Sequence, residues 1–165
     1  MRHAYDWFLP PLVVALILFL SLSTHYLVHA LGPRTTSSSS SLSPRHQHLA
    51  LVWLLACVLT TYRRACTTSP GRVRGLGSSR DPRFVALKRL HPGTRWCSRC
   101  RGPKPARAHH CVICRACVPR MDHHCVWTGN CVGMATLPHF VRFLLWANLG
   151  PVSYTHLTLP TICSV

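Results

Sequence analysis

The sequence predicts a membrane protein that is mainly α-helical and that carries a small, loop-rich, cysteine-rich domain with short β-hairpins. Two apolar runs, residues 9–31 and 49–62, hold much of the apolar content of a chain that is 48% hydrophobic and 13% charged. Residues 97–131 contain seven of the ten cysteines and four of the twelve histidines. The formal charge of +16 is uneven, because 15 of the 19 Lys and Arg lie between Arg63 and Arg120. At 165 residues, the chain is one small domain or a membrane segment with an attached module.

The first apolar run, residues 9–31, contains no Asp, Glu, Lys or Arg. As a helix it would cover about 34 Å, against a hydrocarbon core of about 30 Å. Pro10 and Pro11 suit the first turn of a helix, where a missing N–H costs least. We predict a membrane-spanning helix. The alternative is a cleaved signal peptide with Val28-His29-Ala30 as the small-residue cleavage site.

Residues 32–48 form a Ser-rich loop, and the second apolar run, residues 49–62, follows it. Fourteen helical residues cover only about 21 Å, so this run needs its flanks to reach both interfaces. We predict that it is a second membrane helix, and the alternative is a buried or interfacial one. Residues 1–66 are then the membrane segment. The basic block that follows predicts a cytosolic location for the rest of the chain in either topology.

The remaining segments outside the cysteine-rich region are predicted from composition. Residues 67–96 read as a basic cytosolic linker that either contacts anionic lipid headgroups or is simply solvated. Residues 139–150 read as the start of a third membrane helix. Residues 151–165 are an atypical tail in which Pro160 prevents a continuous helix. We expect this tail to be foreign to the rest, as in a truncated or mis-joined gene product.

The density of Cys and His between residues 97 and 131 predicts metal binding. Structural zinc takes four Cys or His ligands, and the Cys-x2-Cys pairs Cys97/Cys100 and Cys111/Cys114 each supply two. A reducing cytosol favours metal ligands and free thiols over disulfides. Two zinc sites need eight ligands. Six cysteines with two histidines would leave one thiol free, and seven cysteines with one histidine would leave none.

Cys125 is the best candidate for a free cysteine, because its neighbours suit a nucleophile. The chain has only three acidic residues, and one of them, Asp122, lies beside His123 and three positions before Cys125. An acid, a base and a thiol form the orienter, base and nucleophile of covalent catalysis. A nearby imidazole increases the fraction of reactive thiolate. The sequence thus predicts a catalytic cysteine beside the metal sites.

A family resemblance rests on one continuous pattern of residues. The pattern runs Cys97-x2-Cys100, then Lys104-Pro105-x-Arg107-x2-His110-Cys111-x2-Cys114-x2-Cys117, then x4-Asp122-His123-His124-Cys125-x-Trp127-x2-Asn130-Cys131-x-Gly133. It resembles the cysteine-rich domain of the DHHC-type protein S-acyltransferases, or palmitoyltransferases, and gives a domain of residues 97–138. The resemblance implies one structural zinc on Cys97, Cys100, His110 and Cys117, and a second on Cys111, Cys114, His124 and Cys131. It also implies that Asp122, His123 and Cys125 are catalytic.

The chain departs from the family pattern at three positions. Val126, Gly129 and Thr136 stand where the family usually has Pro, Asn and Asn. None of the three is an implied zinc ligand or a member of the implied catalytic set. The departures therefore bear on loop geometry more than on chemistry.

The resemblance implies the transfer of a long-chain acyl group, such as palmitate, from acyl-CoA through a Cys125 thioester to a cysteine of a substrate protein. The expected partners are the bilayer, acyl-CoA and cysteine-containing membrane-associated proteins, with no nucleic acid. The chain is expected to be a multi-pass membrane protein of the endomembrane system, in the ER, Golgi or plasma membrane, with its cysteine-rich domain in the cytosol.

The alternatives are an inactive fragment of such an enzyme or a non-catalytic, membrane-tethered zinc module. Such a module would bind nucleic acid, as the basic flank suggests, or act as a RING-like ubiquitin ligase. The nucleic-acid-binding alternative is weakened because aromatic residues are not interleaved with the basic ones. The RING-like alternative is weakened because it needs a longer gap between its pairs of metal ligands.

Overall fold

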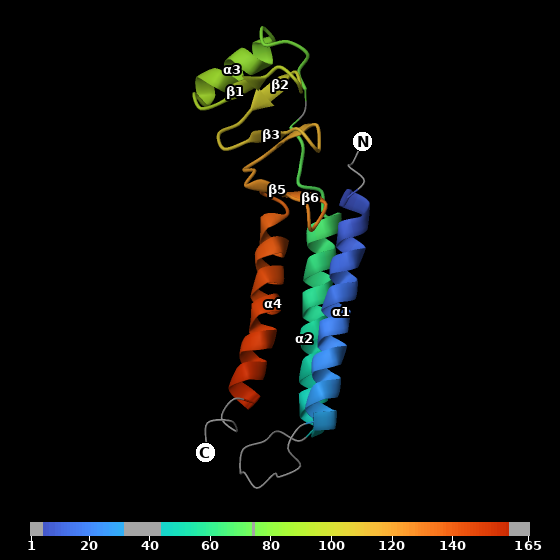
Figure 1. Ribbon diagram of the computed structural model, residues 1–165. Coiled ribbons are helices and arrows are strands. Elements are labelled where there is room, and N and C mark those ends of the chain that lie inside the picture. Colours follow the sequence, from blue (N-terminus) through green and yellow to red (C-terminus); the bar gives the residue numbers. More distant parts are fainter. Residues whose placement is uncertain (1–4, 32–43, 74, 159–165) are drawn as a thin grey trace.

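The computed structural model describes residues 5–31, 44–73 and 75–158 (Figure 1). Three long helices lie roughly alongside one another: α1 (Tyr5–Leu31), α2 (Pro44–Thr67) and α4 (Leu137–Thr158). The cysteine-rich region forms a separate stack at one end of these helices, with β5 and β6 nearest to them and α3 (Pro82–Leu90) farthest away. Sequence predictions for residues 32–43 and 159–165 fall outside the described residues.

The second apolar run lies in a helix longer than the sequence predicted. α2 covers residues 44–67 rather than 49–62, because the polar flanks at His46, His48, Arg63 and Arg64 continue the helix. By length and apolar composition, one helix in the described part of the chain is able to cross a membrane, and it is the segment His48–Thr67. The apolar part of α1 is shorter, Phe8–Ser23. The structure thus supports one of the two predicted spans by this criterion, and a multi-pass arrangement stays a prediction.

The last described helix, α4, begins at Leu137 and continues past Gly150 to Thr158. The sequence predicted only the start of a third membrane helix at residues 139–150, so the helix extends eight residues further than predicted. It packs against α2 through aromatic pairs. Trp53 lies edge-on to Trp146 with ring centroids 5.1 Å apart, and the rings of Tyr62 and Phe143 are 5.0 Å apart. At Gly150 the helices approach so closely that an added Cβ would lie 3.0 Å from the Leu54 Cδ2 atom.

Three short antiparallel hairpins make up the cysteine-rich domain, which confirms the predicted hairpin architecture. They are β1 (Arg95–Cys97) with β2 (Gly102–Lys104), β3 (His109–Cys111) with β4 (Ala116–Val118), and β5 (His123–Cys125) with β6 (Asn130–Val132). Two-stranded hairpins of three-residue strands are not stable alone in water. A buried cluster of Cys111, Val118 and Cys131 joins the second hairpin to the third.

Residues 67–96, predicted to be a linker, run along the hairpins and contain α3. The carboxylate of Asp81 caps the start of α3 by accepting a hydrogen bond from the Arg83 N–H at 2.9 Å. The buried Phe84 of α3 packs edge-on against Trp96 of β1, with ring centroids 4.8 Å apart. Val73 N–H donates to the Cys117 carbonyl at 3.0 Å. This segment therefore packs against the cysteine-rich domain.

Candidate metal centres and active site

The three hairpins are repeats of one 14-residue unit, since the strands β1, β3 and β5 begin at residues 95, 109 and 123. The last residue of each of these strands is a cysteine: Cys97, Cys111 and Cys125. A second cysteine follows three residues later in the first two hairpins, as Cys100 and Cys114, whereas Thr128 stands there in the third. The turns share an unusual backbone, because Arg101, Arg115 and Gly129 occupy the same place in the repeat and all have positive φ.

Each hairpin after the first also presents a cross-strand His–Cys pair. His110 lies opposite Cys117 in the second hairpin, and His124 lies opposite Cys131 in the third. Opposed residues of an antiparallel pair project to the same face. The equivalent pair in the first hairpin is Trp96 opposite Pro103, neither of which offers a metal ligand.

Two four-ligand clusters form because the Cys-x2-Cys turn of one hairpin meets the His–Cys pair of the next. The first cluster is Cys97, Cys100, His110 and Cys117, and the second is Cys111, Cys114, His124 and Cys131. Within each cluster the ligand atoms all lie within 4.8 Å of one another. These are the eight residues that the resemblance implied. A ligand count alone did not distinguish this interleaved arrangement from others.

The distances within both clusters suit tetrahedral zinc. In the first cluster the His110 Nδ1 atom lies 3.7, 3.2 and 3.8 Å from the Sγ atoms of Cys97, Cys100 and Cys117. In the second cluster the His124 Nδ1 atom lies 3.6, 3.4 and 3.4 Å from those of Cys111, Cys114 and Cys131. Zinc–sulfur bonds of about 2.3 Å and zinc–nitrogen bonds of about 2.1 Å at a tetrahedral angle require nitrogen–sulfur separations of about 3.6 Å. The clusters can therefore hold two zinc ions.

The electrostatics of the thiols also favour a cation. Burial raises the pKa of Cys117 to about 12, and the neighbouring thiols of Cys97 and Cys100 add to the effect. Burial likewise raises the pKa of Cys131 well above its usual value, with the Cys114 and Cys111 thiols contributing. Burial thus disfavours the thiolate forms of Cys117 and Cys131, and a bound dication would stabilise them.

Cys125 lies outside both clusters for a reason visible in the repeat. The turn of the third hairpin has Thr128 in place of a second cysteine, and the Thr128 hydroxyl donates to the Cys125 carbonyl at 3.3 Å. No further hairpin follows in the described chain to supply a His–Cys pair. The Cys125 side chain is only 6% exposed.

The alternation of side chains along β5 places a candidate metal ligand and the candidate catalytic residues on opposite faces of the strand. His124 projects toward Cys131 and the second cluster, so His123 and Cys125 project to the opposite face of the strand. The His123 Nδ1 atom lies 3.1 Å from the Asp122 Oδ2 atom, and the His123 ring packs edge-on against Phe140 of α4 at 5.7 Å. Among the described residues, no hydrogen bond joins the His123 ring to the Cys125 thiol. Catalytic hydrogen bonds of this kind often tighten only when substrate binds.

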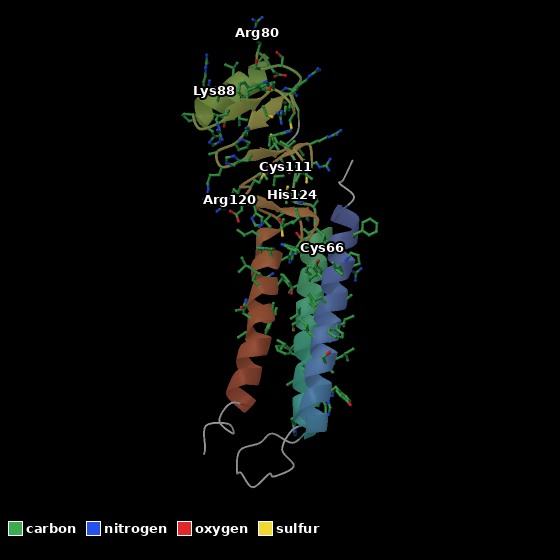
Figure 2. All side chains as sticks on the ribbon, in the orientation of Figure 1. Cys66, Arg80, Lys88, Cys111, Arg120 and His124 are labelled. Atoms are coloured by element: carbon green, nitrogen blue, oxygen red, sulfur yellow. The ribbon has the colours of Figure 1, made fainter. Side chains whose placement is uncertain are left out.

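A cavity of about 480 Å³ opens beside Asp122. Its walls are basic at Arg107 and Arg120, and apolar at Met121, Met134, Leu137 and Pro138. Figure 2 shows Arg120 beside the third hairpin, and Cys111 and His124 where the second and third hairpins meet. It also shows Cys66 at the end of α2 just beneath them. The cavity beside Asp122 therefore has walls from the third hairpin and from the start of α4.

Sequence reasoning missed two residues at this junction, Tyr62 and Asn130. Tyr62 O–H donates to the Trp127 carbonyl at 2.7 Å. The Asn130 amide donates to the carbonyl of Ala65 in the last turn of α2 and to that of Thr68, the residue after α2. Asn130 belongs to the quoted motif, but nothing in the motif indicates its partner. Tyr62 carries no signal, since an aromatic residue at the end of an apolar run is common.

Comparison with known proteins identifies relatives over most of the chain. The family model for the DHHC palmitoyltransferase domain matches residues 91–165. The chain is 40% identical over 152 residues to palmitoyltransferase pfa4 of Neurospora crassa, covering 89% of this chain and 30% of that protein. It is 40% identical over 142 residues to palmitoyltransferase PFA4 of Gibberella zeae, covering 85% of this chain and 29% of that protein.

A third relative, palmitoyltransferase PFA4 of Saccharomyces cerevisiae, is 46% identical over 98 residues, which are 59% of this chain and 22% of that protein. The chain thus spans about a third or less of the length of these relatives. The match includes the hairpins, both clusters and the Asp-His-His-Cys sequence at residues 122–125. On this evidence, the chain carries a DHHC palmitoyltransferase domain.

Proposed function

We propose that this chain is a protein S-palmitoyltransferase, or the part of one that carries its reactive centre, and that Cys125 is the nucleophile. One observation carries the proposal: Cys125 is the one cysteine of the three hairpins outside both metal clusters, and it shares a strand face with His123, whose ring is held by Asp122. A nucleophile, a base and an orienting carboxylate are thereby gathered on one side of β5.

The reaction has two thioester exchanges. The Cys125 thiolate attacks the carbonyl carbon of a long-chain acyl-CoA, and the carbon–sulfur bond to CoA breaks. The CoA thiolate leaves with the proton that His123 took from Cys125. A substrate cysteine then gives its proton to His123 and attacks the carbonyl carbon of the Cys125 thioester. The carbon–sulfur bond to Cys125 breaks, and the Cys125 thiolate takes the proton from His123 to become a free thiol. Asp122 holds the His123 ring and stabilises its protonated form.

The two zinc ions would be structural. Cys97, Cys100, His110 and Cys117 would hold one, and Cys111, Cys114, His124 and Cys131 the other. Buried apolar residues are few in these hairpins, so the domain has little core of its own. Structural zinc contributes on the order of 10 to 16 kcal/mol in small peptides. When bound, the metal would hold the hairpins at a fixed separation and so position β5.

The proposed setting is the cytosolic face of an endomembrane bilayer or of the plasma membrane. α1, α2 and α4 would lie in the bilayer as a multi-pass bundle, and residues 67–138 would stand in the cytosol. This orientation is supported by Arg63 and Arg64 at the end of α2 that bears the hairpins. The partners would be acyl-CoA and membrane-associated proteins that present a cysteine at that face.

The proposal is tested by incubating the zinc-loaded chain in lipid vesicles with palmitoyl-CoA that carries an alkyne label. We expect a label on Cys125 that neutral hydroxylamine removes, because hydroxylamine cleaves thioesters. Cys57→Ala serves as the control, since Cys57 lies within α2 and outside the site. Labelling that survives hydroxylamine, or that persists in Cys125→Ala, would contradict the assignment.

A further inference from the structure

The end of α2 is capped by a residue that lies 65 positions away in the sequence. The last carbonyl groups of a helix have no partner within it, and they usually bond to water or to a nearby residue. Here the Asn130 side-chain amide donates to the carbonyls of Ala65 at 2.9 Å and Thr68 at 2.8 Å, and lies 3.4 Å from that of Cys66. Asn130 is 6% exposed, so these bonds are shielded from water.

The orientation of Asn130 is fixed on both sides of its amide. While its nitrogen donates to α2, its Oδ1 atom accepts a hydrogen bond from the Cys131 N–H at 3.0 Å. Asn130 also lies directly opposite Cys125 in the β5–β6 register. The side chain that holds the end of α2 is therefore the cross-strand neighbour of the proposed nucleophile.

Tyr62 makes a second connection one turn earlier on α2. Its O–H donates to the Trp127 carbonyl, in the turn after Cys125, at 2.7 Å, and it lies 3.4 Å from the Pro10 carbonyl of α1. The ring is 2% exposed and packs on Phe143 of α4. Tyr62 thus connects the turn after Cys125 to all three long helices.

We propose that Asn130 and Tyr62 are positioning residues that hold Cys125 at a fixed depth over the membrane end of α2. Tyr62 holds the turn that follows Cys125, and Asn130 holds the strand that lies opposite Cys125. A tetrahedral metal site fixes β5 relative to β3, but it does not fix β5 relative to the helices. This role rests on the proposed acyl transfer, in which the thiol must meet the reactive end of a chain that lies in the bilayer. Misplacement of a reacting group by about 1 Å can lower a rate by as much as about a hundredfold.

The test compares the rates at which two maleimides alkylate Cys125 in the full, zinc-loaded chain in lipid vesicles. N-Ethylmaleimide reaches Cys125 from water, whereas a long-chain N-alkylmaleimide presents the same reactive group at the membrane surface. The background carries Cys57→Ser, Cys66→Ser and Cys163→Ser, so that Cys125 is the cysteine outside the metal clusters. Asn130→Leu removes the amide donors, and Tyr62→Phe removes the hydroxyl while keeping the ring.

The matched controls are Asn148→Leu and Tyr26→Phe. Asn148 donates to the Leu144 carbonyl one turn earlier in α4, and Tyr26 is an exposed residue of α1. We expect each test variant to lower the long-chain rate about tenfold and to change the N-ethylmaleimide rate by less than about twofold, with zinc content unchanged. We expect both controls to match the parent in both rates.

The proposal is overturned if both maleimide rates fall together with zinc retained, or if neither rate changes. Should Asn130→Leu release zinc, the Tyr62→Phe variant, whose ring packing is kept, decides the question alone. Maleimide alkylation needs no acyl-CoA chemistry. If palmitoyl-CoA fails to label the chain, the proposed function is wrong. The ratio of the two maleimide rates would still decide whether these residues position Cys125.

Discussion

His124 and Cys131 face each other across the third hairpin with the His124 Nδ1 atom 3.4 Å from the Cys131 Sγ atom, and the adjacent pair, Cys125 and Asn130, faces the opposite way. Because side chains alternate along a strand, two neighbouring residues of β5, the proposed metal ligand His124 and the proposed nucleophile Cys125, face opposite sides. A shift of one residue in the register of β5 would exchange them.

The first prediction concerns the separation of metal binding from chemistry. We expect Cys125→Ala to keep two zinc ions per chain and to lose hydroxylamine-sensitive labelling, because Cys125 lies outside both clusters. Cys114→Ala should lose one zinc ion as well as labelling, since it removes a ligand of the second cluster. Metal analysis and label counting on the same samples check both. Release of zinc by Cys125→Ala would show that this cysteine is a ligand.

The second prediction concerns metal removal. A chelator should unfold the hairpins while leaving α1, α2 and α4 helical, since the loss of on the order of 10 kcal/mol per site exceeds what so small a core supplies. Circular dichroism should retain most of its helical signal, and amide exchange should become fast in β1 to β6. Slow exchange in the hairpins after complete zinc removal would contradict a structural role for the metal.

The third prediction tests the close contact between the second and third hairpins. A Cβ at Gly133 would lie 2.6 Å from the Val118 Cγ1 atom and 3.1 Å from the Pro119 carbonyl oxygen. Gly133→Ala should cost roughly 1 to 3 kcal/mol through overpacking and should weaken zinc binding at the second cluster. Gly93→Ala is the control, because its Cβ would lie 3.4 Å from Ala106 Cβ. Competition with a chromophoric chelator measures both variants, and equal affinities would refute the contact.

The fourth prediction concerns pH. Hydrogen bonds with Arg83 lower the pKa of Asp81, so this carboxylate stabilises the start of α3 above its unfolded pKa and stops doing so as the pH falls through the lowered value. Acidification should therefore loosen the contact between Phe84 and Trp96, visible in Trp fluorescence. Asp81→Asn keeps a capping side chain that does not titrate, so the difference between the fluorescence titrations of the parent and of this variant isolates the effect of Asp81. Identical titrations would show that Asp81 does not cause the change.

The sequence predicted the hairpin domain and, through the resemblance, the eight residues that the structure gathers into two clusters. Local spacing could indicate Cys-x2-Cys pairs, but the partner of each pair lies in the next hairpin, and only the fold shows this. The sequence also marked Asp122, His123 and Cys125 by their chemistry. It did not indicate α3, because residues 67–96 are basic and rich in Gly, and the Asp81 cap lies within them.

The helices show a different limit of sequence reasoning. The longest uncharged run suggested the stronger membrane span in α1, yet α2 is the helix that meets the criterion, since residues beyond its apolar centre extend it on both sides. The contacts of Asn130 and Tyr62 join segments about 65 residues apart. No pattern within a short window of sequence reports such pairs.

Because the clusters are interleaved, the middle hairpin, β3–β4, would serve both metal ions. It supplies His110 and Cys117 to one cluster and Cys111 and Cys114 to the other. Whichever ion binds first has to order this shared hairpin, and the second ion then finds half of its ligands already in place. Zinc loading should therefore be cooperative, with chains that hold two ions or none outnumbering those that hold one, so that a fall in available zinc would convert loaded chains to empty ones over a narrow range of concentration.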